Sequence, residues 1–583
     1  MQLQAHRAHP GVLKSVSVAC AMALMLASAA SHAQVIKPYF EFKLPKLTQI
    51  PGDVSLDTNG ASAPVINAAG MYKLGFEGVS QYDGATFSRN FIPPDTIGAV
   101  GGTQYMETTN GAYAVFDKST GTRTSLMSDT TFWLNAGQTG VPNGDSRIMY
   151  NAAASRWVAI SFASSAADIQ IAVSDTDNAL GTWKSTKFTG YSGFGFGSTA
   201  DYPTLAMDKN ALYIGTNNFA PLTSGGTNSF RGTTLNVIPM ASLFNGVGPT
   251  TTNFQQFVTP YTGVNLPIDV DRGFAIQGVN SNSAGSTGKV VASSLYFTDN
   301  LAYTVNGLST SSATAATLGP VKYASTGTGV GANAANSPVA ARQPSVAIPA
   351  NQAIVAAGDE RTSSSIYEVN GRIYAVTTVD PTGGTVEDRI RVTVLDATTF
   401  AQLSVTDIGD AGYDYYQGSI SVNSAGKVVV AYNRSGLATT ADATGATGKI
   451  SFMARVFDTT GTGALAAVGS EMLLKESLTD DYHNGSVFGL ASVGRQRWGD
   501  YSAVSLDPSN DSQFYVIGEF AREYNNAAGG HPTGTGGSRW GTWIAVIDVA
   551  AAVPEPSTYL LMVLGLGAVG FLARRRQGAV LNA

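Results

Sequence analysis

Four arginines give the clearest chemical signal in this 583-residue chain, because they recur at similar places along it: Arg147, Arg272, Arg342 and Arg497. Each lies near the start of a short apolar stretch. A guanidinium binds a carboxylate through two parallel hydrogen bonds, so several guanidiniums at one opening would bind an acidic ligand. The interpretation that we favour is structural: each arginine pairs with a neighbouring aspartate and joins adjacent units, because position alone does not assign chemistry.

Aromatic residues with polar neighbours stand at the same places. Aromatic rings stack on the apolar faces of neutral sugars, while adjacent polar groups bond to the sugar hydroxyls. Further candidate ligand-binding residues are therefore Asp201, Tyr202, Tyr415, Trp498 and Tyr501. Packing of these rings between structural units explains the same pattern equally well.

Residues Asp480-Asp481-Tyr482-His483 form another concentration of titratable groups. A histidine beside two carboxylates could be a general base or a weak metal ligand, but a solvated loop is the interpretation that we favour. His531 lies in a Gly- and Pro-containing loop. Only these two histidines follow residue 33, so we expect no multi-histidine metal site and no cofactor. A structural calcium ion in the turn at 507–511 is the alternative to a simple turn.

The segments that must position these side chains have β character. Short apolar runs bounded by Gly, Asn, Asp and Pro recur, and long amphipathic helical patterns are absent. Residues 145–150, 156–161, 169–174 and 183–188 predict a four-stranded meander, the content of one propeller blade. Similar units open near residues 94, 145, 201, 271, 342, 416 and 498. We predict an all-β fold, a β-propeller of seven four-stranded antiparallel blades, with six or eight blades as alternatives.

A ring explains how such sheets become stable. One four-stranded sheet cannot bury both of its faces, whereas neighbouring sheets around an axis cover one another. Small residues at the openings fit the crowded axis, and we expect Trp157 and Trp183 to fill the space between blades. The ring is expected to occupy residues 91–550. Residues 34–90 form an irregular extension that either closes the last blade with a strand or wraps the outside.

The units around 94–121, 145–183, 201–219 and 498–548 resemble exported bacterial β-propellers of the sialidase-like architectural group. For a glycoside hydrolase, that resemblance implies Tyr501 or Tyr415 as nucleophile, Glu519 as its base, and Asp500 or Asp201 as acid. Residues 174–183 also resemble a degenerate Asp-box, a hairpin between the third and fourth strands of a blade, whose role would be structural.

The N-terminus has the three parts of a signal peptide. Arg7 and Lys14 precede an apolar run at residues 16–30, and Ser31-His32-Ala33 supplies small residues at the cleavage positions. We expect signal peptidase to cut after Ala33 and leave Gln34 first, so that residues 1–33 are removed. The single cysteine, Cys20, would leave with them, and the mature chain would have no disulfide or thiolate site.

The C-terminus combines a polar motif, an apolar segment and a basic end. Pro554-Glu555-Pro556 lies in a linker at 551–557, an uncharged run follows at 558–573, and Arg574, Arg575 and Arg576 begin the last segment, 574–583. Sixteen helical residues span about 24 Å, and flanking residues extend this toward the ~30 Å hydrocarbon core. We predict a single transmembrane helix with its arginines in the cytoplasm.

This order of features resembles the PEP-CTERM sorting signal. The resemblance implies recognition by an exosortase, a membrane-embedded cysteine protease of Gram-negative bacteria, and cleavage near the motif. It also implies a transient inner-membrane anchor, followed by delivery to the cell surface or to the exopolysaccharide of a biofilm matrix. Between its two prolines Glu555 stays extended, which a protease cleft can accept.

Charge limits the remaining function classes. The whole chain has a net charge of −6, and the predicted signal and tail contain five of its cations, so the mature chain is more acidic still. Nucleic-acid binding needs a cationic surface and is not expected. We predict a non-catalytic binder of polysaccharide or another envelope component. The alternatives are a sialidase-like glycoside hydrolase acting on an acidic sugar, and a purely structural matrix protein.

Overall fold

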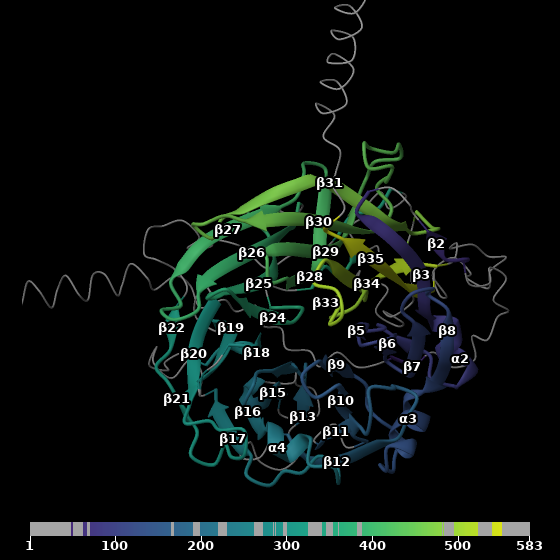
Figure 1. Cartoon of the computed structure of the whole chain (residues 1–583). Helices are drawn as coiled ribbons and strands as arrows, with labels where there is room; N and C mark the ends of the chain where they lie inside the picture. The colour runs from purple at the N-terminus through teal and green to yellow at the C-terminus, as the bar shows by residue number, and fades with distance from the viewer. Residues whose placement is uncertain are drawn as a thin grey trace, which may run out of the picture.

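The computed structural model describes residues 48–49, 62–66 and most of 70–550, with gaps at 165–167, 191–198, 220–229, 262–271, 284, 286, 295–299, 324–340, 345–353, 359–360, 382–386, 481, 483–494 and 523–538. The described residues form seven blades of antiparallel strands around one axis, two of which are joined through a parallel pair of inner strands (Figure 1). This arrangement confirms the predicted all-β propeller and its seven blades. Inner strands surround the axis, and later strands of each blade lie progressively further out.

The first three blades follow one another along the chain. Blade 1 contains β5 (Ile97–Val100), β6 (Gln104–Thr109), β7 (Ala112–Asp117) and β8 (Arg123–Ser128). Blade 2 contains β9 (Arg147–Asn151), β10 (Arg156–Phe162), β11 (Asp168–Ser174) and β12 (Trp183–Thr189). In blade 3 the short strands β13 (Thr199–Asp201) and β14 (Ala206–Met207) share the inner position, followed by β15 (Ala211–Phe219), β16 (Phe230–Pro239) and β17 (Gln255–Pro260).

Blades 4 and 5 are joined into one continuous sheet. Blade 4 contains β18 (Phe274–Ser281), β19 (Gly288–Ser293), β20 (Asn300–Asn306) and the short outer strands β21 (Thr317–Leu318) and β22 (Lys322–Tyr323). Blade 5 contains β24 (Ile366–Val369), β25 (Arg372–Val379), β26 (Arg389–Asp396) and β27 (Gln402–Ile408). The inner strands β18 and β24 pair in parallel. The predicted opening of the fifth unit at 342–345 is therefore wrong, because blade 5 begins at Ile366.

The ring closes with a strand from the beginning of the chain. Blade 6 contains β28 (Tyr413–Val422), β29 (Lys427–Gly436), β30 (Ser451–Thr459) and β31 (Leu465–Glu476). Blade 7 contains β33 (Ala503–Leu506), β34 (Gln513–Ala521) and β35 (Trp540–Asp548), and β3 (Tyr72–Ser80) supplies its fourth strand. β2 (Val65–Ile66) adds a fifth. Of the two roles considered for the N-terminal extension, closure of the last blade is the one that β3 performs, and regular structure begins before residue 91.

Alternation along β29 shows why both faces of a blade are buried. Val428, Val430 and Tyr432 pack in a core with blade 5, whereas Val429 and Ala431 pack in a core with blade 7. Successive side chains of a strand point to opposite faces, so an uninterrupted apolar run serves two interfaces. Trp157 and Trp183 lie in the core between blades 1 and 2, as predicted.

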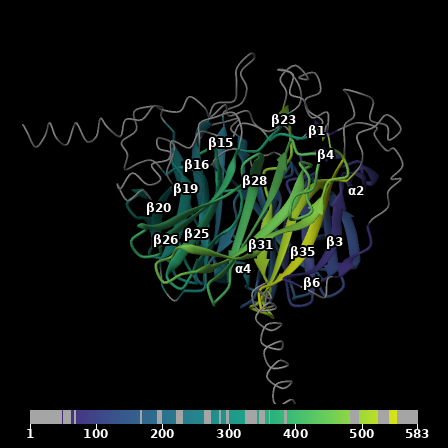
Figure 2. The same ribbon diagram turned by 90° about the horizontal axis from the view of Figure 1, so that it is seen from above.

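The two ends of the ring differ, and we name them by what they carry. The cap face is where the inner strands begin; Figure 2 shows β1 (Thr48–Gln49), β4 (Phe91–Ile92) and β23 (Ile354–Val355) on it. There β1 pairs with β4, and β23 pairs with β32 (Arg495–Gln496). The cavity face is the opposite end, where the inner strands finish. The short helices are α2 (Gln81–Thr86), α3 (Asp129–Asn135) and α4 (Met240–Leu243).

Candidate functional site

Hydrogen bonds join the starts of neighbouring inner strands around the axis. The pairs are Asn110 with Asp95 and Asp145, Arg147 with the Pro203 carbonyl, Thr204 with the Ile276 carbonyl, Tyr202 with the Thr362 carbonyl, Ser363 with the Gly418 carbonyl, Gln417 with the Tyr501 carbonyl, and the Asp500 amide with Asp95. We call this layer, on the cap side of the axis, the axial seal.

A repeated backbone conformation builds the seal. Asp95, Asp145, Tyr202, Ala275 and Gln417 all have φ between 50° and 55°; the first four lie at the starts of inner strands, and Gln417 lies at an irregularity within β28. This left-handed conformation is unfavourable for residues with a Cβ, and most of all for those without a short polar side chain. Its recurrence at equivalent positions indicates that the turn into the inner strand is imposed by closure of the ring.

Stacked rings and guanidiniums fill the centre of the seal. The Arg147 guanidinium lies 3.4 Å from the Tyr501 ring centroid, and the Tyr501 ring is 4.9 Å from that of Tyr202. On the other side the Arg361 guanidinium is 4.4 Å from the Tyr202 centroid. Cation–π contacts of this kind are worth about 2 kcal/mol or more where they are desolvated. The side chains of Arg147, Tyr501 and Tyr202 are all buried.

Four aspartates surround this stack. Burial, together with Asp500 and Asp145, raises the pKa of Asp95 to about 8. Burial, together with Asp201 and Asp500, raises the pKa of Asp145 to about 8 as well. Burial and Asp500 raise the pKa of Asp201 to about 6, with Arg361 acting in the opposite direction. The seal can therefore hold several carboxyl groups because some of them are protonated near neutral pH.

Two of the four predicted arginines meet at the seal, so the alternative in which all four converge on one opening does not hold. Arg497 donates to Asp500 (3.2 Å), close to Arg147 and its stack. Arg272 donates to the Gly319 carbonyl and lies over the Tyr303 ring within blade 4. Its guanidinium turns away from the axis because Gly273, with φ +84°, redirects the chain into β18.

Arg342 lies on the cap face and not at a blade opening. Its Nε and Nη2 atoms donate to the two oxygens of Asp414 (2.8 and 3.0 Å), a fully buried carboxylate at the start of β28. Ala341 forms a bridge with Val355, so this segment belongs to the cap. For Arg342 the favoured interpretation, an ion pair that joins structural units, agrees with the structure.

Tyr415 and Trp498 also pack away from the seal. The Tyr415 ring lies 5.5 Å from that of Tyr432 within blade 6. Trp498 donates to the Asn433 carboxamide (3.0 Å) and meets Tyr482 edge to face in a small apolar core on the cap face. Both rings fill internal space and do not present a stacking surface.

The proposed nucleophile, Tyr501, and the proposed base, Glu519, each form a hydrogen bond with a different partner. The Tyr501 hydroxyl donates to Asp145 (3.3 Å). Glu519 accepts from Gln417 (3.3 Å), and burial and Asp95 raise its pKa well above the usual range. A general base has to be ionised, so a protonated Glu519 is poorly suited to that role. Gly499 permits this packing, because an added Cβ would collide with Glu519 and Gln417.

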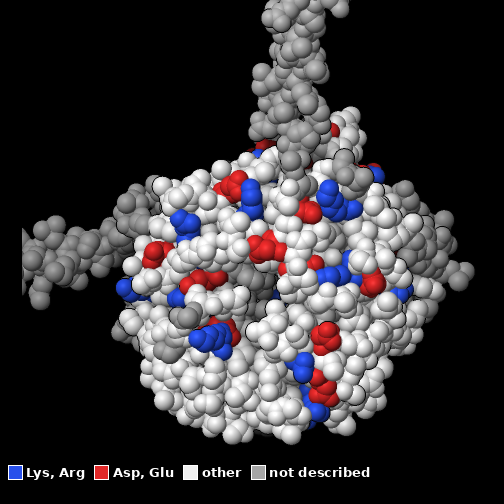
Figure 3. All heavy atoms as spheres, in the orientation of Figure 1, with Lys and Arg blue, Asp and Glu red and all other residues white. Residues whose placement is uncertain are grey.

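A cavity of about 690 Å³ occupies the other half of the axis. All seven inner positions contribute to its wall, through residues of β5, β9, β14, β18, β24, β28 and β33. Figure 3 views the cavity face, where the centre of the ring is hollowed. Arg147 lies at the inner end of the cavity, so the seal forms its floor.

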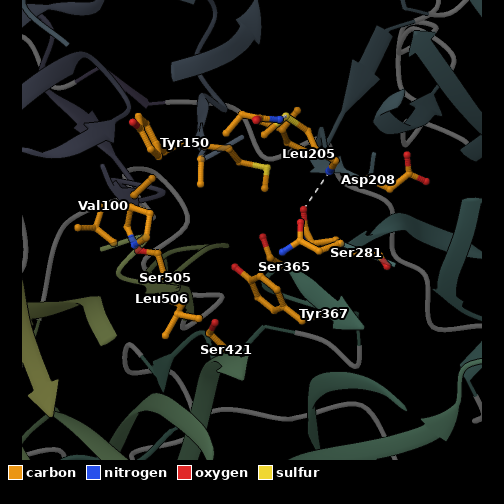
Figure 4. A pocket seen from close by; sticks show the side chains of 18 of the residues that line it. Val100, Tyr150, Leu205, Asp208, Ser281, Ser365, Tyr367, Ser421, Ser505 and Leu506 are labelled. Atoms are coloured by element: carbon orange, nitrogen blue, oxygen red, sulfur yellow. Dashed lines mark hydrogen bonds between the residues drawn. The ribbon is translucent and has the colours of Figure 1, made fainter. Parts of the chain in front are cut away.

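The wall combines hydroxyl, carboxamide and aromatic groups. Tyr150 and Tyr367 lie on opposite sides of the cavity, and Ser365 and Ser421 are near Tyr367 (Figure 4). The Tyr367 hydroxyl donates to the Val504 carbonyl (3.3 Å). The Ser505 Oγ atom is buried and has no hydrogen-bond partner. Such an atom costs free energy until a ligand or water satisfies it.

The carboxylates at the rim are already paired, and Lys209 is an exposed cation beside them. Asp208 accepts hydrogen bonds from the Tyr213 hydroxyl (2.6 Å) and from two backbone amides, and burial raises its pKa. Glu368 binds Lys289 (2.8 Å). The surface that the cavity offers is therefore largely neutral.

The sequence analysis did not select the cavity residues. They lie at the ends of inner strands, whereas the openings attracted attention because their polar residues precede apolar runs. The sequence feature that could have indicated the cavity is the occurrence of Ser and Asn inside those apolar runs, as at Asn280, Ser421 and Ser505. A polar side chain in a strand buried on both faces has to find a partner or line a space.

Several predictions fall outside the described residues. These are the signal peptide with its Ala33–Gln34 junction, the loop residues Asp481, His483 and His531, and the whole segment from 551 onward. No helix in the described ranges has the length and apolarity needed to cross a membrane. Those same ranges contain no group of three or more His, Cys, Asp or Glu side chains placed to hold a metal.

Comparison with known proteins assigns the C-terminal segment. Residues 552–576 match the family model described as the PEP-CTERM protein-sorting motif. The chain carries a PEP-CTERM sorting signal. The signal implies an exported protein that is transiently anchored in a membrane and processed by an exosortase. No curated protein matches the chain.

Solved structures with similar outlines are propellers of low sequence identity. A Trypanosoma rangeli sialidase is 12% identical over 73% of this chain and 55% of its own, with a TM-score of 0.29. The Dos1 propeller is 10% identical over 82% and 95%, with a TM-score of 0.36. The propeller of the Trilobed protease from Pyrococcus furiosus is 10% identical over 79% and 91%, at 0.30. This chain spans about half of the sialidase, and scores of this size support no argument about function.

Proposed function

We propose that this exported propeller is a non-catalytic binder of a neutral saccharide of the cell surface or matrix, and that the axial cavity holds the sugar. The observation that supports the proposal is the contrast between the two halves of the axis. In the seal, rings and charged groups contact one another. In the cavity, hydroxyl, carboxamide and aromatic groups face a space of about 690 Å³.

The cavity has the size and chemistry that a saccharide needs. Small-molecule sites usually measure about 300–1,000 Å³ and combine apolar walls with a few polar groups. Tyr150 and Tyr367 provide ring faces for the C–H surfaces of a sugar, and Ser505 provides an unused hydroxyl. Because Asp208 and Glu368 are paired, a cationic sugar would gain little from the rim, and Lys209 is the one exposed cation among the residues that line the described cavity.

A glycoside hydrolase acting on an acidic sugar is the second candidate. It is favoured by the raised pKa values of Asp145 and Asp201 beside Tyr501. Burial argues against it, since the Tyr501 ring has no exposed surface and its hydroxyl is bonded to Asp145. Arg147 lies at the inner end of the cavity, but its guanidinium is engaged by the Tyr501 ring and the Pro203 carbonyl.

A glycan array with the processed chain, run beside a fluorogenic glycosidase panel, tests the proposal. We expect binding of neutral oligosaccharides without turnover. Ser505→Leu should abolish binding by filling the cavity. Tyr367→Phe should weaken binding, whereas its matched control Tyr374→Phe, which loses a hydrogen bond to Thr459 outside the cavity, should not.

Each alternative has its own outcome. Turnover that disappears in Tyr501→Phe would replace the proposal with the hydrolase. Absence of both binding and turnover, with the thermal unfolding of the chain intact, would favour a purely structural matrix protein. Binding that survives Ser505→Leu would show that the saccharide binds outside the axial cavity.

A further inference from the structure

The last strand of the ring ends beside the mouth of the cavity. β35 runs toward the cavity face, where Asp548 pairs with Gln513. The Val549 amide donates to the Ser512 carbonyl (2.9 Å), and the Ala550 amide donates to Asp548 (3.0 Å). The wall strand β33 is two strands inward, about 10 Å away at the usual strand spacing. The chain is therefore held on this face up to Ala550.

The distance from this point to the membrane segment is short. Seven residues, 551–557, separate Ala550 from the predicted apolar run that begins at 558. Fully extended, they reach about 25 Å. An inner strand such as β28, with 10 residues, is about 33 Å long, so the linker cannot pass around a blade to the cap face. While the anchor is intact, the cavity face has to be the face nearer to the membrane.

Charge on this face provides little second attachment, although Lys209 is exposed at the cavity rim. Three lysines near the ends of its strands are paired with carboxylates: Lys118 with Asp507, Lys289 with Glu368, and Lys427 with Asp458. In Figure 3 basic and acidic side chains alternate over the face. Binding to an anionic leaflet needs a cluster of unpaired cations. The peptide linker alone would hold this face against the lipid.

We propose that the cavity face is a membrane-facing surface in the anchored precursor, and that cleavage by the exosortase exposes the cavity mouth to large ligands. The orientation follows from the end of β35 and the length of the linker, and it stands whether or not the cavity binds a sugar. The regulation of binding rests on the proposed function. Before cleavage, the lipid surface keeps a polymer out of the cavity mouth. After cleavage, the ring is no longer tethered to the membrane, and the cavity mouth becomes accessible to a polymer.

Single cysteines provide the test, because the only cysteine of the chain lies in the predicted signal peptide. Ala153→Cys places a thiol on the exposed rim of the cavity. Thr440→Cys places a matched thiol on an exposed loop of the cap face. Both are labelled with a polymer-linked maleimide, in anchored precursor from cells without exosortase and in the processed chain.

We expect the Ala153→Cys thiol to react an order of magnitude more slowly in the precursor than in the processed chain, and the Thr440→Cys thiol to react equally in both. A flexible Gly/Ser insertion of about 20 residues after Ala550 should restore labelling of the anchored rim thiol. Equal labelling of the rim in both forms would overturn the proposal. So would slow labelling that persists after the insertion. Glycan binding by the processed chain is measured separately. A failure of the orientation test therefore leaves the binding result unaffected, and a failure of the binding test leaves the orientation result unaffected.

Discussion

Asp145 shows how burial changes the chemistry of one side chain at the axis. Its backbone adopts φ +54°, its carboxyl group accepts a hydrogen bond from Tyr501, and two further aspartates lie near enough to raise its pKa. A charged carboxylate here would meet low dielectric and like charge together. Protonation removes both costs, so the seal tolerates a buried aspartate at this position.

We predict that the protein loses stability as the pH rises from about 6 to about 8. The folded pKa of about 8 for Asp95 and Asp145 exceeds the unfolded value of about 3.9. The native state therefore binds more protons between these values, and its free energy of unfolding falls through this window. Asp145→Asn, which suits the left-handed backbone, should flatten the dependence and raise Tm at pH 9. A Tm that rises toward pH 9, or an unchanged slope in the variant, would contradict this account.

Tyr501→Phe tests the structural role of the phenol. The substitution keeps the ring under Arg147 and removes one hydrogen bond to Asp145, so we expect a loss of about 0.5–1.5 kcal/mol in unfolding free energy. Chemical denaturation measures this loss. Saccharide binding on the array should be unchanged, because the phenol belongs to the seal; a variant that folds normally but no longer binds would place the ligand at Tyr501.

At the scale of strands, the sequence predicts where an inner strand begins better than it predicts where the side chains at that point are directed. The openings at 94, 145, 201 and 498 lie within a few residues of inner strands, because a polar residue before an apolar run marks a turn into a sheet. The unit predicted at 342–345 has the same composition, but the preceding residue, Ala341, pairs with cap strand β23. The convergence of arginines was not predictable, since side-chain direction depends on left-handed residues whose φ no pattern reveals.

Gly499 offers a test of packing between the cap and the seal. Gly499→Ala should cost about 1–3 kcal/mol, because the new methyl group would collide with Glu519 and Gln417, which have no space to move apart. Gly461→Ala is the control: nothing lies within 4 Å of its added Cβ, and we expect a change within about 0.5 kcal/mol. Urea titrations of both variants give the comparison. Equal effects would show that the 499 backbone can shift freely.

For the whole molecule, the closing pair of β3 and β35 determines whether the ring exists. Leu74, Phe76 and Val79 of β3 are buried in the core between blades 7 and 1. At about 1.5–3 kcal/mol for each side chain, their burial contributes roughly 5–9 kcal/mol. A typical domain has a net stability of about 5–15 kcal/mol. The N-terminal segment is therefore as important to the fold as any blade.

Removal of residues 34–80 should consequently prevent cooperative folding. We expect the shortened chain to show no sharp thermal transition and to bind a hydrophobic dye, because the edge of β35 and its apolar face become exposed. Addition of a peptide with the sequence 62–80 should restore part of the transition. A shortened chain that melts at the temperature of the full one would show that six blades and a partial seventh close without β3.

The position of β35 between β34 and β3 also has a mechanical consequence. Drag on a tethered body pulls on the C-terminal end of β35, along the strand. The load is then shared in shear by the hydrogen bonds to both neighbours, which must break together, instead of peeling away one at a time. The strand that connects the ring to its anchor is thus the one whose geometry resists tension best.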